Sequence, residues 1–116
     1  MGFYAEYYKC ALQVNPFSYA KYRVDIEQNK DVYNEGIVTK CKQYAIKVAG
    51  LADHGSVDTA ESLRKKLEDN GIIVFPGFEI SSAEKIHMVC LFSPKKTLSE
   101  LNRILGSPVL PIRYEY

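Results

Sequence analysis

The chain has 116 residues and a formal net charge of +1, and 47% of its residues are hydrophobic while 25% are charged. This composition is typical of one soluble globular domain and excludes a global electrostatic field that would attract nucleic acid or anionic lipid. No apolar stretch approaches the ~20 residues of a membrane helix, and the amino terminus lacks the pattern of a signal peptide. We therefore expect one domain, residues 1–116, in the cytoplasm and without a membrane partner.

The first half of the chain predicts a strand, a helix and a second strand. The aromatic and apolar run Tyr7–Val14 favours a strand that ends at Asn15-Pro16. A long polar loop, residues 16–30, leads to a predicted helix over Asp31–Lys47, and a short strand over Val48–Ala52 follows. The expected apolar face of this helix consists of residues at helical spacing: Tyr33, Ile37, Cys41, Tyr44 and Val48.

The middle of the chain predicts a helix between two strands. Asp58 and Glu61 resemble a capping box, and Asn70-Gly71 supplies the left-handed residue that ends the helix. Ile72–Phe75 is an uninterrupted apolar run, as expected for a strand buried on both faces, and Ile86–Phe92 is another.

The last part of the chain predicts a final helix and completes the fold class. Thr97 and Glu100 form a second capping box at its start, and a short extended tail follows the helix. Apolar strands that alternate with helices predict an α/β fold with a largely parallel sheet.

The three cysteines are expected to be free thiols. Their odd number and the missing secretion signal argue against disulfides, and the apolar surroundings of Cys10, Cys41 and Cys90 predict burial in the core. His87 and Cys90 form an H-x-x-C pair, but on a strand these side chains point to opposite faces. A metal shared by the two is therefore disfavoured.

Polar side chains follow the predicted strands at their carboxyl ends, where functional residues of parallel α/β folds gather. We expect these ends to converge, and a histidine and two acids there would suit a divalent cation. His87 reaches the same place if its strand is adjacent. The residues concerned are Gln13 and Asn15 after the first strand, Asp53 and His54 after the second, and Glu79 after the third.

Three segments together resemble the PHP (polymerase and histidinol phosphatase) superfamily, and the resemblance runs from about Lys9 to Leu105. It looks closest to the PHP domains that precede large ATPases in one chain. It implies a parallel-strand, distorted β/α barrel whose site hydrolyses phosphoesters with Mn, Zn or Fe at the strand ends. The segments are Leu51-Ala52-Asp53-His54-Gly55, Phe75-Pro76-Gly77-Phe78-Glu79-Ile80 and Ile86-His87-Met88-Val89.

The resemblance also implies roles for individual residues. By position, His54, Glu79 and His87 would be metal ligands, and Asp53 would orient or support the site. The catalytic set would then be Asp53, His54 and Glu79. The metals would activate water and neutralise charge on the phosphoryl group.

Two departures from the family pattern predict an impaired site. The opening His-x-His of the family falls on Gln13 and Asn15, and neutral amides are poor ligands for zinc or manganese. A full barrel of this kind takes ~250 residues, so residues 1–116 are expected to be either a truncated, degenerate domain or the amino-terminal part of a full barrel. The later histidines of the family have no counterpart after His87.

These features favour a degenerate, phosphoesterase-related domain that acts as a scaffold or regulatory module. An unfinished sheet exposes an edge, so we expect a homo-oligomer or an ATPase partner. A first alternative is an active metal-dependent phosphoesterase whose site is completed by a partner subunit. A second is a nucleic-acid-binding module that uses aromatic and basic residues of the loop 16–30: Tyr19, Lys21, Tyr22 and Arg23.

Overall fold

The computed structural model describes residues 7–18, 29–53, 57–106 and 112–113. The loop residues Tyr19, Lys21, Tyr22 and Arg23, and His54, lie outside these ranges. The elements in chain order are β1 (Lys9–Val14), α2 (Lys30–Gln43), β2 (Ile46–Leu51), the 3-10 turn η1 (Asp58–Ala60), α3 (Glu61–Asp69), β3 (Ile73–Phe75), β4 (Gly77–Ser82), β5 (His87–Leu91), α4 (Leu98–Leu105) and β6 (Ile112–Arg113).

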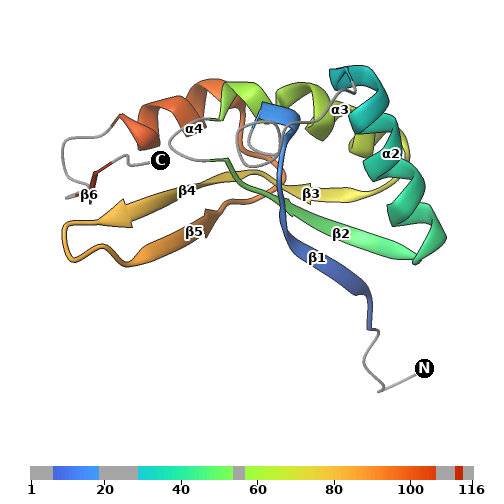
Figure 1. Ribbon diagram of the computed structural model, residues 1–116, viewed down its shortest axis with the longest axis horizontal. Helices are drawn as coiled ribbons and strands as arrows, with labels where there is room; N and C mark the ends of the chain where they lie inside the picture. The colour runs from blue at the N-terminus through green and yellow to red at the C-terminus, as the bar shows by residue number, and fades with distance from the viewer. Residues whose placement is uncertain (1–6, 19–28, 54–56, 107–111, 114–116) are drawn as a thin grey trace.

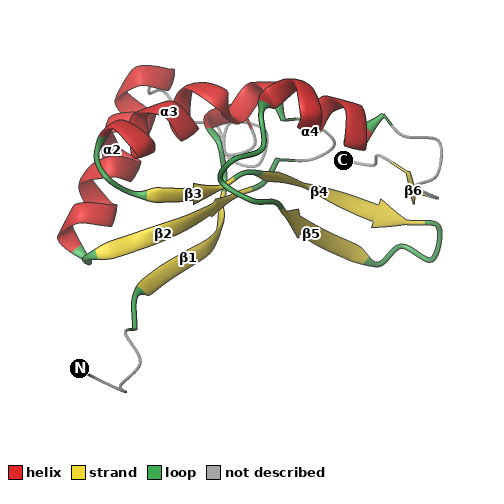
Figure 2. Ribbon diagram, turned by 180° about the vertical axis from the view of Figure 1, so that it is seen from behind, coloured by secondary structure: helices red, strands yellow, loops and turns green. Residues whose placement is uncertain are grey.

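The strands form two linked sheets with the helices layered on one side (Figures 1 and 2). The first sheet is parallel with the order β1-β2-β3, and the second is antiparallel with the order β5-β4-β6. A backbone bond joins them, in which the Glu79 amide donates to the Asp53 carbonyl at 2.8 Å. The Phe92 amide donates to the Pro76 carbonyl at 2.8 Å and so extends the pairing of β4 with β5. The end of β2 therefore lies against β4.

The α/β class predicted from the sequence is confirmed, but the sheet is parallel only in part. Strand β4 was not predicted, because Pro76-Gly77 is typical of a turn. It forms an antiparallel hairpin with β5, so the described strands make two three-stranded sheets and no closed barrel. A Cβ on Gly77 would lie 1.8 Å from the Cys90 carbonyl oxygen. Only glycine allows β4 to approach β5 this closely.

Helix α2 is shorter than the predicted Asp31–Lys47. It ends at Gln43 because the chain reverses into β2 at Ala45, whose φ is 55°. The buried face is also rotated relative to the prediction, since Tyr44 is 56% exposed. The buried residues of α2 are Asn34, Val38 and Cys41.

Only one of the two predicted capping boxes forms. Thr97 and Glu100 bond reciprocally at the start of α4, as predicted. Asp58 instead begins the turn η1, and α3 has no side-chain cap at its start; Asp58 Oδ1 accepts a bond of 2.9 Å from Asn102. Gly71, with φ 77°, confirms the predicted end of α3.

Two apolar clusters make the core. One lies between α2, α3 and the parallel sheet, and the other lies between α4 and β4. Leu67 and Val74 are fully buried in the first, but Ile73 is 53% exposed, so the prediction that both faces of β3 are buried was wrong. No helix in the described ranges is long and apolar enough to cross a bilayer.

The cysteines are free in this structure, as predicted, but they are not all buried. Cys41 is buried, Cys90 is half-buried, and Cys10 on β1 is exposed. Burial raises the pKa of the Cys41 and Cys90 thiols. Exposure of Cys10 follows from its place on an outer strand.

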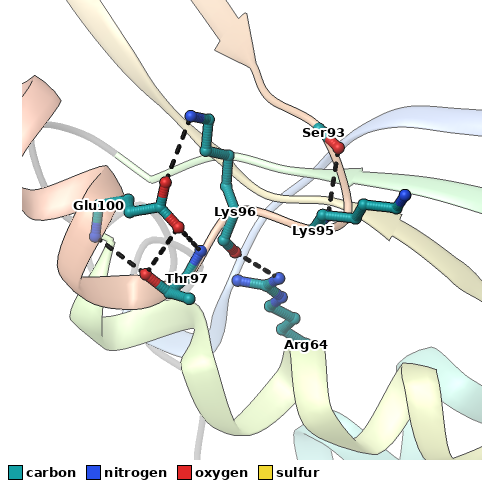
Figure 3. Close-up of polar contacts among 6 residues, drawn as sticks. All are labelled: Arg64, Ser93, Lys95, Lys96, Thr97 and Glu100. Atoms are coloured by element: carbon teal, nitrogen blue, oxygen red, sulfur yellow. Dashed lines mark hydrogen bonds and ion pairs between the residues drawn. The ribbon is translucent and has the colours of Figure 1, made fainter.

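Arg64 ties α3 to the segment that precedes α4 (Figure 3). The guanidinium is buried and its Nη2 donates to the carbonyl oxygens of Pro94 and Lys96, at 3.0 and 2.8 Å. A buried cation needs such partners, because its desolvation is otherwise costly. This contact connects α3 to the residues that lead into α4.

Candidate functional site

A polar cluster surrounds Glu79 on β4. The strand alternates, so Phe78 and Ile80 pack under α4 while Glu79 and Ser81 take the opposite face. Glu79 Oε2 lies 3.4 Å from Gln13 Nε2, which donates to it, and Glu79 Oε1 lies 3.7 Å from His87 Nδ1. The cluster therefore gathers residues from β1, β4 and β5.

His87 enters the cluster through strand pairing. It lies directly opposite Ser81 in the β4–β5 hairpin, and Ser81 Oγ is hydrogen-bonded to His87 Nδ1 at 3.1 Å. The condition for His87 to join the site, an adjacent strand, is thus met. Cys90 packs instead with the α4 cluster, as the opposite-face prediction requires.

The Glu79 carboxylate is buried, and the imidazole beside it is open to solvent. Glu79 is 7% exposed, whereas the His87 side chain is 63% exposed. A buried carboxylate depends on nearby donors for its stability, and Gln13 supplies one. His87 and Gln13, which are both exposed, are therefore the residues of the cluster that a solute can reach.

Asp53 connects three segments next to the Glu79 cluster through hydrogen bonds. Its Oδ2 accepts hydrogen bonds from Ser18 Oγ and Thr59 Oγ1, both at 2.6 Å, and its carbonyl accepts the Glu79 amide. Distances this short are typical of hydroxyl donors to a carboxylate. Asp53 thus connects the segment after β1, the turn η1 and β4.

Asn15 directly follows β1 and is half-buried. Its carbonyl oxygen accepts a hydrogen bond of 2.8 Å from the Tyr33 hydroxyl, and burial raises the pKa of Tyr33. Its side-chain Oδ1 is buried and has no hydrogen-bond partner in the described structure. An unsatisfied buried acceptor costs free energy, so this position is not optimised for an amide.

The donors within the described residues do not by themselves complete a catalytic metal centre. No group of three or more His, Cys, Asp or Glu side chains in the described ranges is placed to hold a metal ion. Glu79 and His87 supply two candidate ligands, while the Gln13 N–H points at Glu79 and Asp53 is bonded by two hydroxyls. Catalytic zinc sites commonly use three protein ligands.

Sequence reasoning missed three hydroxyl residues of this region: Ser18, Thr59 and Ser81. Ser81 follows Glu79 by two positions, so the alternation of β4 places both on one face once the strand is recognised. The contacts of Ser18 and Thr59 with Asp53 have no local signal, because they depend on how two loops meet β2.

Comparison of the chain with protein-family models, with curated proteins and with solved structures found no match. What the chain does must therefore be inferred from its residues and their geometry.

Proposed function

We propose that the chain is a PHP-like, phosphoesterase-related domain that lacks a working metal centre and acts as a scaffold or regulatory module. The observation that supports this function is the contact between Gln13 and Glu79. At the position where the family pattern has a metal-binding histidine, an amide N–H donates to the acid that would bind the metal.

The chemistry of the amide favours a metal-free site. An imidazole lone pair and a carboxylate both attract a cation, whereas an amide N–H is repelled by one. Gln13 therefore stabilises the Glu79 carboxylate directly, by hydrogen bonding. Asn15 repeats the substitution two residues later, and its buried Oδ1 has no partner in the described structure.

The arrangement of the strands supports a role in assembly. Strand β1 lies at the edge of the parallel sheet, and Leu12 on it is exposed. Unpaired strand edges favour pairing with another chain. The proposed partners are a second copy of this chain or an ATPase.

The test is hydrolysis of an aryl phosphate with added Mn²⁺, measured for the wild type and for Glu79→Gln. We expect no turnover above background in either protein, since Glu79 and His87, the two candidate ligands among the described residues, do not complete a metal centre. Mn²⁺-dependent turnover that Glu79→Gln abolishes would contradict the proposal and favour the active phosphoesterase. Light scattering on the same samples measures the oligomeric state. Turnover found only in oligomeric samples would indicate a site that a partner subunit completes.

A further inference from the structure

Basic and aromatic side chains gather where β1 and β2 begin, at the end of the parallel sheet away from Glu79. The net charge of +1 does not reveal this local excess of positive charge. Residues 7–18 and 36–52 contain four lysines and no acidic residue. We call this surface the lysine–tyrosine end. It consists of Tyr7, Tyr8, Lys9, Lys40, Lys42, Tyr44 and Lys47.

The parallel pairing of β1 and β2 brings these residues to one end. Lys9 pairs with Ile46 in the sheet register, so the first residues of both strands lie side by side. Helix α2 ends at Gln43, and the left-handed Ala45 turns the chain directly into β2. The last turn of α2 therefore adjoins the same end of the sheet (Figure 1).

The side chains of this end are open to solvent. Tyr7 is 91% exposed, and Tyr8 and Tyr44 are more than half exposed. The four lysines are exposed as well. Large aromatic side chains favour burial, so several exposed rings among lysines mark a binding surface.

The four lysines of this end can interact with an anionic ligand. None of the four forms an ion pair in the part of the chain that the structure describes. The Glu35 carboxylate lies 2.7 Å from Lys66 Nζ. The contact with Lys66 is the largest cause of the lowered Glu35 pKa, and the positive charge of Lys42 lowers this pKa further. The positive field of this end is therefore free to attract an anionic polymer.

We propose that the lysine–tyrosine end binds single-stranded nucleic acid. Lysine ammonium groups suit the phosphate backbone, and exposed phenol rings are platforms on which unpaired bases stack. Anionic lipid suits this end less well, because its rings all carry hydroxyl groups and, of the described residues on β1, Leu12 is the one exposed aliphatic side chain that could insert into acyl chains. The surface is separate from the Glu79 cluster, so the two proposals fail or succeed independently.

Fluorescence anisotropy with labelled (dT)20 and (rU)20 tests the proposal. We expect a dissociation constant of about 10 µM at 50 mM salt, with a slope of about −2 for log affinity against log salt if three phosphates are contacted. The Lys42→Glu/Lys47→Glu variant should bind about tenfold more weakly. Tyr44→Ala should also lose about tenfold, whereas Tyr44→Phe keeps the ring and should bind as the wild type does.

Lys65→Glu/Lys95→Glu is the matched control, because it makes the same charge change on exposed residues elsewhere. It should retain most of the affinity, and circular dichroism checks that every variant is folded. No binding to either oligonucleotide, or an equal loss in the control, would overturn the proposal. Binding to phosphatidylserine vesicles in place of both oligonucleotides would overturn it too, and a preference between (dT)20 and (rU)20 identifies the nucleic acid.

Discussion

The side-chain amide of Gln13 and the carboxylate of Glu79 lie 3.4 Å apart, although 66 positions separate these residues in the chain. Gln13 is on an outer strand of the parallel sheet, and Glu79 is on the central strand of the antiparallel sheet. The contact exists because the end of β2 is bonded to β4, which carries Glu79 past the end of β1. Both sheets thus contribute to one polar cluster.

Replacement of Asp53 should destabilise the fold more than replacement of an exposed acid. Asp53→Ala leaves the Ser18 and Thr59 hydroxyls without their acceptor, so we expect a loss of about 2 kcal/mol in the free energy of unfolding. Asp58→Ala, which removes one exposed hydrogen bond to Asn102, should cost less than about 1 kcal/mol. Urea denaturation measures both, and equal losses would contradict the role assigned to Asp53.

Two Gly→Ala substitutions should act in opposite directions. At Gly77 the new methyl group would lie 1.8 Å from the Cys90 carbonyl oxygen, so Gly77→Ala should cost about 3 kcal/mol or prevent folding. At Gly36, within α2, nothing lies within 4 Å of the new methyl group, so Gly36→Ala should stabilise by about 0.5–1 kcal/mol. Thermal denaturation compares them, and a stable Gly77→Ala protein would refute the β4–β5 pairing described here.

Arg64 should matter far more than its neighbour Lys65. Arg64→Met removes the hydrogen bond to the Lys96 carbonyl, drawn in Figure 3, and the one to the Pro94 carbonyl, and should cost about 2 kcal/mol. Lys65 is exposed, so Lys65→Met should change stability by less than about 0.5 kcal/mol. Hydrogen exchange of the α4 amides should rise in Arg64→Met alone; unchanged exchange would show that α4 docks without this contact.

The capping box of α4 should make stability depend on pH. Hydrogen bonds from Thr97, and then the contact with Lys96, lower the pKa of Glu100 below 4.5. A lowered folded-state pKa adds stability above the unfolded value, and this stability disappears as the pH falls through the folded value.

Thr97→Ala should therefore cost about 1 kcal/mol near neutral pH. The difference from the wild type should shrink as the pH falls below 4.5, because a protonated Glu100 no longer gains from the cap. Urea denaturation across this range measures the change. A difference that stays constant would mean that the Thr97 hydroxyl alone forms the cap.

Local patterns predicted most elements but not their pairing. The Thr97–Glu100 box and Gly71 mark helix ends through contacts within one turn, which the sequence encodes directly. Strand β4 was missed because Pro76-Gly77 is typical of a turn, although the alternation of Phe78 to Ser81 continues the strand. The prediction of a largely parallel sheet was wrong for the same reason.

The candidate site was predictable only in part. Gln13, Glu79 and His87 come together, but not at the carboxyl ends of three parallel strands, because Glu79 lies within β4 and His87 begins β5. The Asp53 side chain turns to Ser18 and Thr59, and loop contacts of this kind have no periodic signal in sequence. His54 lies outside the described residues, so its role as a ligand stays a prediction.

Calorimetric titration with Mn²⁺, for the wild type and for Gln13→His/Asn15→His, tests the central claim most directly. The double substitution places two imidazoles at the positions that the family pattern assigns to metal ligands, beside Glu79. We predict that the wild type binds Mn²⁺ no tighter than about 1 mM and that the variant binds about tenfold tighter or more, since histidine is a far better ligand than an amide. Tight binding by the wild type, or no gain in the variant, would contradict the account of Gln13 and Glu79 as a metal-free remnant of a metal site.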